Sequence, residues 1–382
     1  MKLAFGLMRL PKIDNDDAKI DIEKFKEMVD KFMAEGGTYF DTAYVYHKGE
    51  SERAFKTAIT ERYPRDKYTI TDKMPIFKLK QKEDLEYIFN EQLEKTGVSY
   101  FDYYWLHALN NNYMKTVDEL DGFGFIKRKQ EEGKIKHIGF SFHDSAEVLD
   151  KILTDHPEVE FVQLQINYID WYDDVNVQSK LCYDVCVKHN KKVMVMEPIK
   201  GGKLANVPAE AEKLMKDYNP NASVASWAIR YVASLENVER VLSGMSTIEQ
   251  VNDNTSYMKD FKPLNEEEMQ IIEKVVEIIK SVVTIPCTGC RYCVEENACP
   301  MNICIPDYFA LYNDKKAYNM KNGDPADRYK KLMETHGKAS ECIECGMCEA
   351  HCPQHLTIRD YLKTITKEVE EKLDWWKNLY AP

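Results

Sequence analysis

Several features that would place this chain in a membrane or on nucleic acid are missing from its 382 residues. No stretch approaches the roughly 18 consecutive apolar residues of a membrane-spanning helix. The start, MKLAFGLMRLP, is interrupted too soon by polar residues to form a secretory signal peptide. Acidic residues outnumber basic ones, 64 to 52, which disfavours nucleic acid and anionic membrane surfaces as main partners. We therefore expect a cytoplasmic protein with neither a membrane nor a nucleic-acid partner.

Cysteine is scarce over most of the chain and concentrated in one part of it. Nine of the eleven cysteines fall between Cys287 and Cys352, and only Cys182 and Cys186 lie outside. A cytoplasmic location keeps thiols reduced, which argues against a disulfide framework and points to metal binding. The two outliers are expected to be buried core thiols. This distribution divides the chain into a cysteine-poor region, residues 1–284, and a cysteine-rich region, residues 285–382.

The cysteine-poor region alternates short apolar runs with segments of helical periodicity, for example at residues 21–37, 84–97 and 179–190. The apolar runs are nearly continuous, which is typical of parallel strands buried on both faces. Eight such units in about 260 residues predict a (β/α)8 barrel, with an open doubly wound sheet as the alternative. No GxGxxG follows any run, which weakens that alternative. The expected strands are Lys2–Leu7, Thr38–Asp41, Tyr68–Thr71, Tyr103–His107, His137–Ser141, Phe161–Ile166, Val193–Glu197 and Arg240–Ser243.

Polar residues stand where seven of the expected strands end. They are Asp41, Lys73, His107, Ser141, Asn167, Glu197 and Ser243. In a (β/α)8 barrel the carboxyl ends of the strands surround the active site, so these side chains should converge on one pocket. Tyr46 lies five residues after Asp41, and a neighbouring ammonium favours the phenolate form of a tyrosine. With Asp41, Lys73 and His107, it predicts a site that protonates a carbonyl oxygen or removes a proton from an alcohol.

The stretch DTAYVY, the lysine of TDK and the histidine of DYYWLHALN resemble the aldo-keto reductase family, and the likeness extends from Met1 to about Asp260. The resemblance implies a (β/α)8 barrel and NAD(P)H-dependent reduction of a small carbonyl compound, or the reverse oxidation of an alcohol. It also implies that Tyr46 is the general acid, assisted by Lys73, Asp41 and His107. Nicotinamide contacts are implied at Ser141 and Gln163, and contacts to the dinucleotide's phosphates and adenosine in residues 198–202 and 244–254. The full set of implied cofactor-binding residues is Ser141, Gln163, Met196, Pro198, Ile199, Gly201, Gly244, Met245, Ser246, Gln250 and Asn254.

Some residues depart from the family's pattern. Members of the family usually stack an aromatic ring on the nicotinamide, and Met196 takes that place here. They often have an asparagine directly after the serine of the fifth strand, where this chain has Phe142. Members that prefer NADPH often supply Lys and Arg where this chain has Gly244 and Gln250. The lack of cations at these two positions favours NADH, although Arg240 or another cation could contact a 2′-phosphate. The departures leave a second enzyme class open, in which the barrel's acid–base groups work without nicotinamide, as in a lyase.

Two cysteine motifs occupy the second region. They read Cys287-x2-Cys290-x2-Cys293-x5-Cys299-Pro300 and Cys342-x2-Cys345-x2-Cys348-x3-Cys352-Pro353. A Cx2Cx2C run followed by CP, occurring twice, predicts two [4Fe–4S] clusters in which the fourth cysteine of each motif crosses to the other cluster. One cluster then takes Cys287, Cys290, Cys293 and Cys352, the other takes Cys342, Cys345, Cys348 and Cys299, and Cys304 is left over. Structural zinc is the alternative.

The residues between the two motifs have helical patterns, so this region resembles the helical type of two-cluster ferredoxin domain, followed by a terminal helix. Hydride carries two electrons together, whereas each cluster carries one, and three hypotheses follow. In the first, the clusters are structural and the reductase works alone. In the second, the clusters exchange electrons with a ferredoxin-like partner, with a flavin as mediator if one binds. In the third, the chain is an electron-transfer protein with a degenerate barrel, which the intact set of four catalytic residues argues against.

Overall fold

The computed structural model describes residues 1–14, 16–173, 177–294, 299–316, 324–371 and 373. Its internal contacts divide the chain into two compact units, one made of Met1–Ile199 with Asn221–Met269 and the other of Lys200–Pro220 with Gln270–Pro382. The segment Lys200–Pro220 is thus grouped with the cysteine-rich region, although it precedes the eighth strand in the sequence. The expected domain boundary after residue 284 differs from this division and stays a prediction. Within the described residues, no helix is long and apolar enough to cross a membrane.

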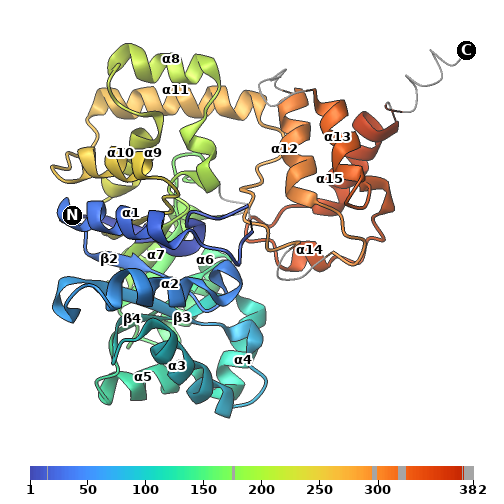
Figure 1. Ribbon diagram of the computed structural model, residues 1–382. Helices are drawn as coiled ribbons and strands as arrows, with labels where there is room; N and C mark the ends of the chain where they lie inside the picture. The colour runs from blue at the N-terminus through green and yellow to red at the C-terminus, as the bar shows by residue number, and fades with distance from the viewer. Residues whose placement is uncertain (15, 174–176, 295–298, 317–323, 372, 374–382) are drawn as a thin grey trace, which may run out of the picture. The chain divides into compact units, whose positions relative to one another are not determined.

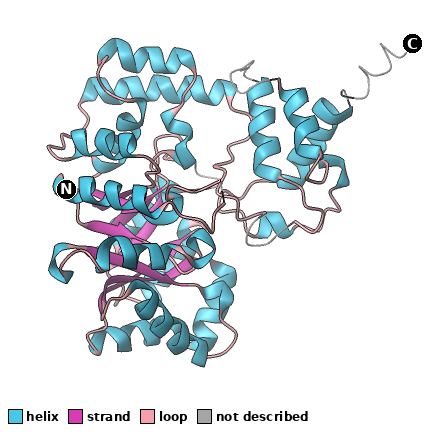
Figure 2. Ribbon diagram, in the orientation of Figure 1, coloured by secondary structure: helices cyan, strands magenta, loops and turns pink. Residues whose placement is uncertain are grey.

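Eight parallel strands form a closed barrel in the first unit, in sequence order, with β1 pairing with both β2 and β8 (Figures 1 and 2). All eight expected strands are present, so the predicted barrel is confirmed. The strands are β1 (Leu3–Gly6), β2 (Tyr39–Asp41), β3 (Thr69–Met74), β4 (Phe101–Leu109), β5 (Ile135–Phe142), β6 (Phe161–Gln165), β7 (Lys192–Met196) and β8 (Val238–Ser243).

Helices of the first unit surround these strands (Figure 2). They are α1 (Ile22–Ala34), α2 (Ser51–Phe55), α3 (Glu83–Thr96), α4 (Asn111–Leu120), α5 (Gly122–Glu131), α6 (Ala146–Asp155), α7 (Ser179–Lys188), α9 (Val224–Ala233) and α10 (Ile248–Met258). Short 3₁₀ or π segments are η1 (Leu7–Arg9), η2 (Tyr46–Gly49), η3 (Lys56–Thr60), η4 (Arg65–Lys67) and η5 (Ile76–Lys78). The three helical patterns noted in the sequence correspond to α1, α3 and α7.

Local signals explain where helix α1 begins and how it packs. The Asp21 side chain accepts a hydrogen bond from the backbone N–H of Lys24, which satisfies one of the free amides at the helix start. Phe25 and Phe32 are among its buried residues, and both rings contact the ring of Phe5 in β1, so the helix packs on this strand. Gly37 follows the helix, and a Cβ there would lie 2.4 Å from the Phe32 ring. The Phe32 ring therefore leaves no room for a Cβ at position 37, and only glycine fits there.

The second unit is helical, as predicted. It contains α8 (Ala209–Tyr218), most of α11 (Glu266–Val282), α12 (Ile305–Lys316), α13 (Pro325–Met333), α14 (Met347–Ala350) and α15 (Ile358–Ile365), with the short segments η6 (Lys200–Ala205), η7 (Ala339–Glu341) and η8 (Thr366–Glu370). Aromatic side chains of α12 and α13 form much of its core, where the rings of Tyr308 and Tyr329 stack with centroids 4.5 Å apart. The expected terminal helix runs into residues 374–382, which lie outside the described residues.

Candidate functional site

The four expected catalytic residues come from neighbouring elements of the barrel. Asp41 ends β2, and Tyr46 begins η2, five residues later. Lys73 lies within β3 and His107 within β4, because these strands run further than the sequence suggested. Parallel strands place all of these residues at the carboxyl end of the barrel, where (β/α)8 enzymes carry their active sites.

The Lys73 ammonium is the centre of this group. Its Nζ lies 2.5 Å from Asp41 Oδ1, 2.7 Å from the carbonyl oxygen of Thr42 and 3.5 Å from the hydroxyl of Tyr46. The side chain of Lys73 is 1% exposed and that of Asp41 4%, so this is a buried ion pair. Burial raises the pKa of Asp41, and the charge of Lys73 opposes that rise. A buried cation held by a carboxylate thus faces the phenol of Tyr46.

His107 is a neutral imidazole beside that phenol. Burial, together with the charge of Lys73 and then that of His143, holds its pKa well below the ordinary value for histidine. Its ring lies edge-on to Tyr46, with centroids 6.1 Å apart, and 5.8 Å from the ring of Phe77. Its Nδ1 is buried without a hydrogen-bond partner among the described residues. The site therefore offers a phenol, an ammonium and an unsatisfied ring nitrogen at one place.

His47, which the sequence interpretation overlooked, holds the segment that carries Tyr46. Its Nε2 accepts a hydrogen bond from the backbone N–H of Leu10 (3.0 Å), so its Nδ1 is the nitrogen that donates to the carbonyl oxygen of Asp17 (3.1 Å). Its backbone is left-handed (φ 54°), which turns the chain sharply directly after Tyr46. Burial lowers the pKa of this histidine, in agreement with the neutral form that these two bonds need.

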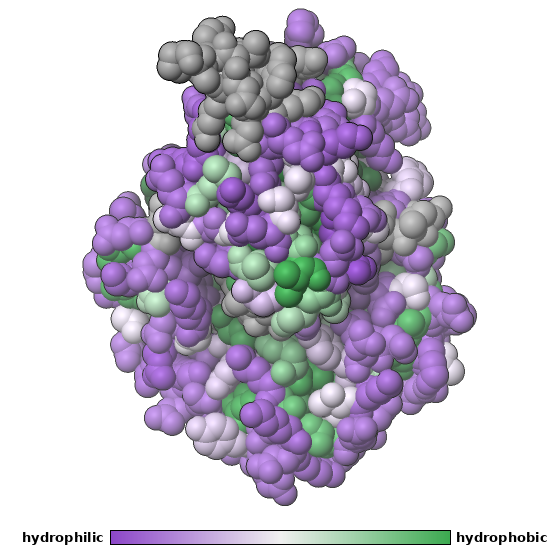
Figure 3. All heavy atoms as spheres, turned by 90° about the vertical axis from the view of Figure 1, so that its right-hand side faces the viewer, coloured by the Kyte–Doolittle hydropathy of each residue, from purple (hydrophilic) through white to green (hydrophobic). Residues whose placement is uncertain are grey.

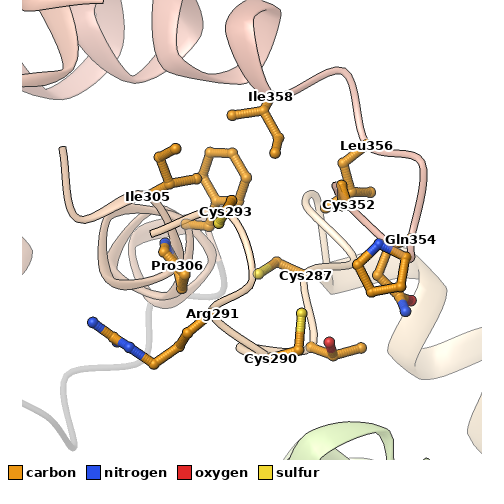
Figure 4. A pocket seen from close by; sticks show the side chains of 13 residues that line it. Cys287, Cys290, Arg291, Cys293, Ile305, Pro306, Cys352, Gln354, Leu356 and Ile358 are labelled. Atoms are coloured by element: carbon orange, nitrogen blue, oxygen red, sulfur yellow. The ribbon is translucent and has the colours of Figure 1, made fainter. Parts of the chain in front are cut away.

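A separate cavity lies in the second unit, lined by cysteines of both motifs (Figure 4). Cys287, Cys290 and Cys293 of the first motif and Cys352 of the second border it together. Burial raises the pKa of Cys293, and the neighbouring thiols of Cys290, Cys287 and Cys352 raise it further. This is the set of four expected for one cluster, with the crossing of the fourth cysteine included.

The cavity suits a multi-iron cluster. Thr288 lines it, and the Thr288 hydroxyl is buried without a partner among the described residues, so it has a hydrogen to offer to a sulfur atom. Within the described part of the chain, no three Cys, His, Asp or Glu side chains lie close enough to hold one metal ion. In a [4Fe–4S] cube each thiolate binds a different iron, so its ligands surround a larger volume.

The other cysteine set is more open. Cys348 is buried, Cys342 and Cys299 are half-buried, and Cys345 is exposed. The pKa of Cys348 is raised to about 11 by burial first, then by Glu349 and by the thiols of Cys342 and Cys299. Cys299 of the first motif is therefore near the thiols of the second, as the crossing requires.

The remaining three cysteines belong to neither set. Cys304 is buried and does not border the cavity, and burial raises the pKa of its thiol to about 11. Cys182 and Cys186 are buried in α7. The nearby His189 has its Nε2 2.6 Å from a carboxylate oxygen of Asp150. All three cysteines are buried, and their expected role as unligated thiols stays a prediction.

Comparison with known proteins gives the family of the first region. Residues 2–277 match the Aldo/keto reductase family, and residues 286–357 match a 4Fe-4S dicluster domain. This chain belongs to the aldo/keto reductase family. One relative, a "Probable aldo-keto reductase 1" of Glycine max, is 28% identical over 186 residues, which are 46% of this chain and 49% of that protein. The match thus spans about half the length of this curated relative.

Solved aldo-keto reductases share the fold of the barrel. The enzyme AKR11C1 of Bacillus halodurans has a TM-score of 0.57 at 20% identity, with 72% of this chain and 91% of that one covered. An aldo-keto reductase of Klebsiella pneumoniae, solved in complex with NADPH, has a TM-score of 0.58 at 18% identity, with 72% and 90% covered. A third, from Brucella melitensis, has a TM-score of 0.55 at 22% identity, with 72% and 94% covered.

Two residues implied as nicotinamide contacts are neighbours in this aldo/keto reductase barrel. Ser141 in β5 pairs with Gln163 in β6, and both are buried. The Ser141 hydroxyl accepts a hydrogen bond from the backbone N–H of Ala108 (2.7 Å). The side-chain oxygen of Gln163, Oε1, is buried and has no partner among the described residues. Met196 ends β7 and packs on an apolar cluster that includes Trp105. The side-chain oxygen of Gln163 is thus free to accept a hydrogen bond from a bound group.

The other implied cofactor residues are spread over two stretches. Pro198 and Ile199 follow β7 in the first unit, whereas Gly201 belongs to the second unit. Gly244 and Met245 directly follow β8, and α10 begins at Ile248 with Thr247 as its cap. Near that helix start, the Gln250 side chain accepts a hydrogen bond from the Ser246 N–H, and the Asn254 amide donates to the Ser243 hydroxyl.

Arg9, which the sequence interpretation did not single out, is a cation at this place. Its carbonyl oxygen accepts a hydrogen bond from the Ser246 hydroxyl (2.6 Å), and its side chain lies against Gly244, where a Cβ would come within 3.3 Å of it. One guanidinium nitrogen, Nη2, is buried without a partner in the described part of the chain. The signal was available, because a closed barrel places the end of the first strand beside the end of the eighth.

Proposed function

We propose that the barrel catalyses NAD(P)H-dependent reduction of a small carbonyl compound, or the reverse oxidation of an alcohol, with Tyr46 as the proton donor. The observation that carries this proposal is the buried ammonium of Lys73, held between Asp41 and the phenol of Tyr46. A bound nicotinamide would supply hydride to the carbonyl carbon. Tyr46 is placed to give its phenolic proton to the carbonyl oxygen, which would become a hydroxyl.

Each partner of Tyr46 has a separate task in that step. The ammonium of Lys73 stabilises the phenolate that remains after proton transfer, and Asp41 holds that ammonium in place at 2.5 Å. Neutral His107 is placed to donate a hydrogen bond to the carbonyl oxygen and so to orient it beside the phenol. Phe77, next to His107, gives the pocket an apolar wall.

Three observations support nicotinamide as the hydride source. Gln163 has an unsatisfied carbonyl oxygen that suits the amide N–H of a nicotinamide carboxamide. Arg9 offers a buried guanidinium nitrogen beside the start of α10, where phosphate groups bind well. The related Klebsiella pneumoniae enzyme was solved with NADPH. Arg9 supplies a cation that Gly244 and Gln250 do not, so the preference for NADH inferred from those two positions loses weight.

Replacing Tyr46 by Phe tests the proposal. The substrate is unknown, so the probe is a panel of aromatic and aliphatic aldehydes and ketones, with NADPH or NADH consumption followed by absorbance under anaerobic conditions. We expect Tyr46→Phe to lower the rate by about a hundredfold or more, the usual contribution of a general acid. Tyr44→Phe is the matched control, because the Tyr44 hydroxyl binds Glu91 instead (2.9 Å). Full activity of Tyr46→Phe would refute the proposed role.

A second function is single-electron exchange between the clusters and a ferredoxin-like protein. Cys345, a proposed ligand, is exposed, and so are the neighbouring apolar side chains of Ile343 and Met347. Exposed apolar groups around a redox centre suit a transient protein contact. Figure 3 shows that one face of the molecule is largely hydrophilic with smaller hydrophobic areas.

An anaerobic titration with NADPH and NADH separates these functions. Loss of cluster absorbance on adding the nucleotide would support electron transfer between nicotinamide and clusters. Nucleotide binding without that loss would support a reductase that works alone. Failure to bind either nucleotide would favour the lyase-type alternative.

A further inference from the structure

Buried polar side chains lie together where strand β3 meets the helices outside the barrel. Glu52 comes from α2, Asp72 from β3 and Gln92 from α3, and each is 0% exposed. Asp72 directly precedes Lys73, and successive side chains of a strand point to opposite faces, so Asp72 points away from the active site. Apolar side chains usually fill such a place. The cluster of Glu52, Asp72 and Gln92 is therefore not explained by packing alone.

Two members of this cluster bind the main chain of Lys73. Asp72 Oδ1 accepts a hydrogen bond from the Lys73 N–H (2.8 Å), and Gln92 Nε2 donates one to the Lys73 carbonyl oxygen (3.1 Å). Gln92 Nε2 also donates to Glu52 Oε1 (3.0 Å), and Gln92 Oε1 accepts a hydrogen bond from the Tyr104 hydroxyl. Because every polar atom of the Gln92 amide has a partner, its orientation is fixed. The cluster thus holds both main-chain polar groups of Lys73.

A shared proton accounts for the contact between the Glu52 and Asp72 carboxyl groups. Glu52 Oε2 and Asp72 Oδ2 are buried without a hydrogen-bond partner in the described part of the chain. The Lys95 ammonium lies 3.5 Å from Glu52 Oε2 but also pairs with Glu91 (2.9 Å), so it cannot balance two more carboxylates. Burial, and then the charge of Glu52, raises the pKa of Asp72 well above its ordinary range. Burial also raises the pKa of Glu52, but Lys95 and Gln92 oppose that rise. Asp72 is therefore the protonated partner, and its hydroxyl donates to Glu52.

The position of Lys73 decides how strongly its charge acts on Tyr46. Lys73 Nζ lies 3.5 Å from the Tyr46 hydroxyl, and the attraction between an ammonium and a phenolate weakens as that distance grows. Asp41 and the Thr42 carbonyl oxygen hold the ammonium end of the side chain. The cluster holds the main-chain end, and a buried network with satisfied hydrogen bonds is rigid. Lys73 is thus fixed at both ends.

We propose that this cluster, and Asp72 in particular, positions the Lys73 ammonium beside the phenol of Tyr46. Its members touch no reacting atom and act only through the main chain of Lys73. One oxygen of Asp72 accepts from the Lys73 N–H, while the protonated oxygen donates to Glu52, so the two carboxyl groups carry one negative charge between them. The inference deepens the proposed function and rests on it, because Lys73 acts in that function through Tyr46.

Two substitutions at Asp72 separate positioning from packing. Asp72→Asn has the shape of the protonated acid, with an oxygen that accepts from Lys73 and an N–H that donates to Glu52, so it should behave like the wild type. Asp72→Leu is of similar size but loses both hydrogen bonds. In that variant we expect the titration midpoint of Tyr46 to rise by about one pH unit, a tenfold change in its ionisation constant. We also expect kcat to fall about tenfold while KM for the nucleotide stays unchanged.

The ultraviolet absorbance of the phenolate measures the ionisation of Tyr46 in the full-length holoprotein under anaerobic conditions. Each titration is repeated with Tyr46→Phe added, and the difference removes the signal of the clusters and of all other tyrosines. The pH dependence of the rate, measured with the aldehyde and ketone panel, gives kcat and KM. If Asp72→Leu does not fold, Gln92→Met carries the same expectation, because it loses the hydrogen bond to the Lys73 carbonyl oxygen.

Asp102→Leu is the matched control. Asp102 is 7% exposed, and its Oδ2 accepts a hydrogen bond from the backbone N–H of Ile70 (3.0 Å), which lies nearer the start of β3 than Lys73 does. This substitution also removes a carboxylate from the main chain of β3, so it should lower the free energy of unfolding in urea. The titration of Tyr46 and kcat should stay near those of the wild type.

Three results would overturn the inference. They are an unchanged titration of Tyr46 in folded Asp72→Leu or Gln92→Met, an Asp72→Asn variant as impaired as Asp72→Leu, and a shift in Asp102→Leu as large as in Asp72→Leu. Failure of the proposed function is seen separately. Full activity of Tyr46→Phe would reject that function, whereas the titration needs no substrate and still reports whether the cluster acts on Lys73.

Discussion

The ion pair between Asp41 and Lys73 makes a quantitative prediction about stability. The two side chains are 4% and 1% exposed, and their charged atoms lie 2.5 Å apart. In Asp41→Asn the ammonium stays buried and keeps neutral acceptors such as the Thr42 carbonyl oxygen (2.7 Å), but it loses the carboxylate charge beside it. Removing one partner of a buried pair costs about 3–5 kcal/mol, because the other charge is left uncompensated. We expect the free energy of unfolding to fall by about that amount.

Urea denaturation followed by circular dichroism measures this loss, with cluster content held constant by anaerobic work. Asp155→Asn is the matched control, because Asp155 and Lys151 are also 2.5 Å apart but largely exposed, and we expect no measurable change there. Lys73→Met removes the buried charge itself. The double variant should therefore be more stable than the sum of the two single effects predicts, by about 2 kcal/mol. Additive effects, or an Asp41→Asn variant as stable as the control, would refute the buried ion pair.

Three other predictions concern the cofactor side, the histidines and the cluster ligands. Arg9→Gln should weaken NADPH binding by about tenfold or more in a fluorescence titration, because the phosphate loses a charged partner; equal affinities would exclude Arg9 from the site. His107 and His47 have lowered pKa values, so below about pH 6.5 the unfolded chain binds protons that the native state does not. The free energy of unfolding should then fall on acidification by up to about 1.4 kcal/mol per pH unit for each histidine, until the pH reaches the pKa of that histidine in the native state. Denaturation curves that do not change between pH 7 and pH 5 would contradict this. Cys352→Ser should lower the iron bound per chain, whereas Cys304→Ser should not, and equal iron contents would contradict the assignment.

The sequence predicted the four proposed catalytic residues because each stands next to a strong local pattern. Asp41 and His107 are the polar residues at or near the ends of apolar runs, and barrel topology brings such ends together. The extent of β3 and β4 was harder to predict, since Lys73 and His107 lie inside strands that continue past the apolar stretches. Hydrogen bonding to neighbouring strands, and not side-chain polarity, decides where these strands end.

His47 and Arg9 were overlooked for a different reason. The partners of His47 are backbone groups of Leu10 and Asp17, and such partners leave no trace in a pattern of side chains. Arg9 gains its importance from Gly244, which is more than two hundred residues away in the sequence. Closure of the barrel, which pairs β1 with β8, brings Arg9 to Gly244, whereas His47 meets Leu10 and Asp17 because β1 and β2 are neighbouring strands.

By itself the sequence determined the barrel class, the set formed by Asp41, Tyr46, Lys73 and His107, and the two cysteine motifs. Apolar periodicity and cysteine spacing are properties of residues close together in the chain, so they can be recognised without coordinates. Only the tertiary structure decided that the segment Lys200–Pro220, which precedes the eighth strand, is grouped with the cysteine-rich region. Contacts between distant segments depend on how whole elements pack, and no local pattern records that.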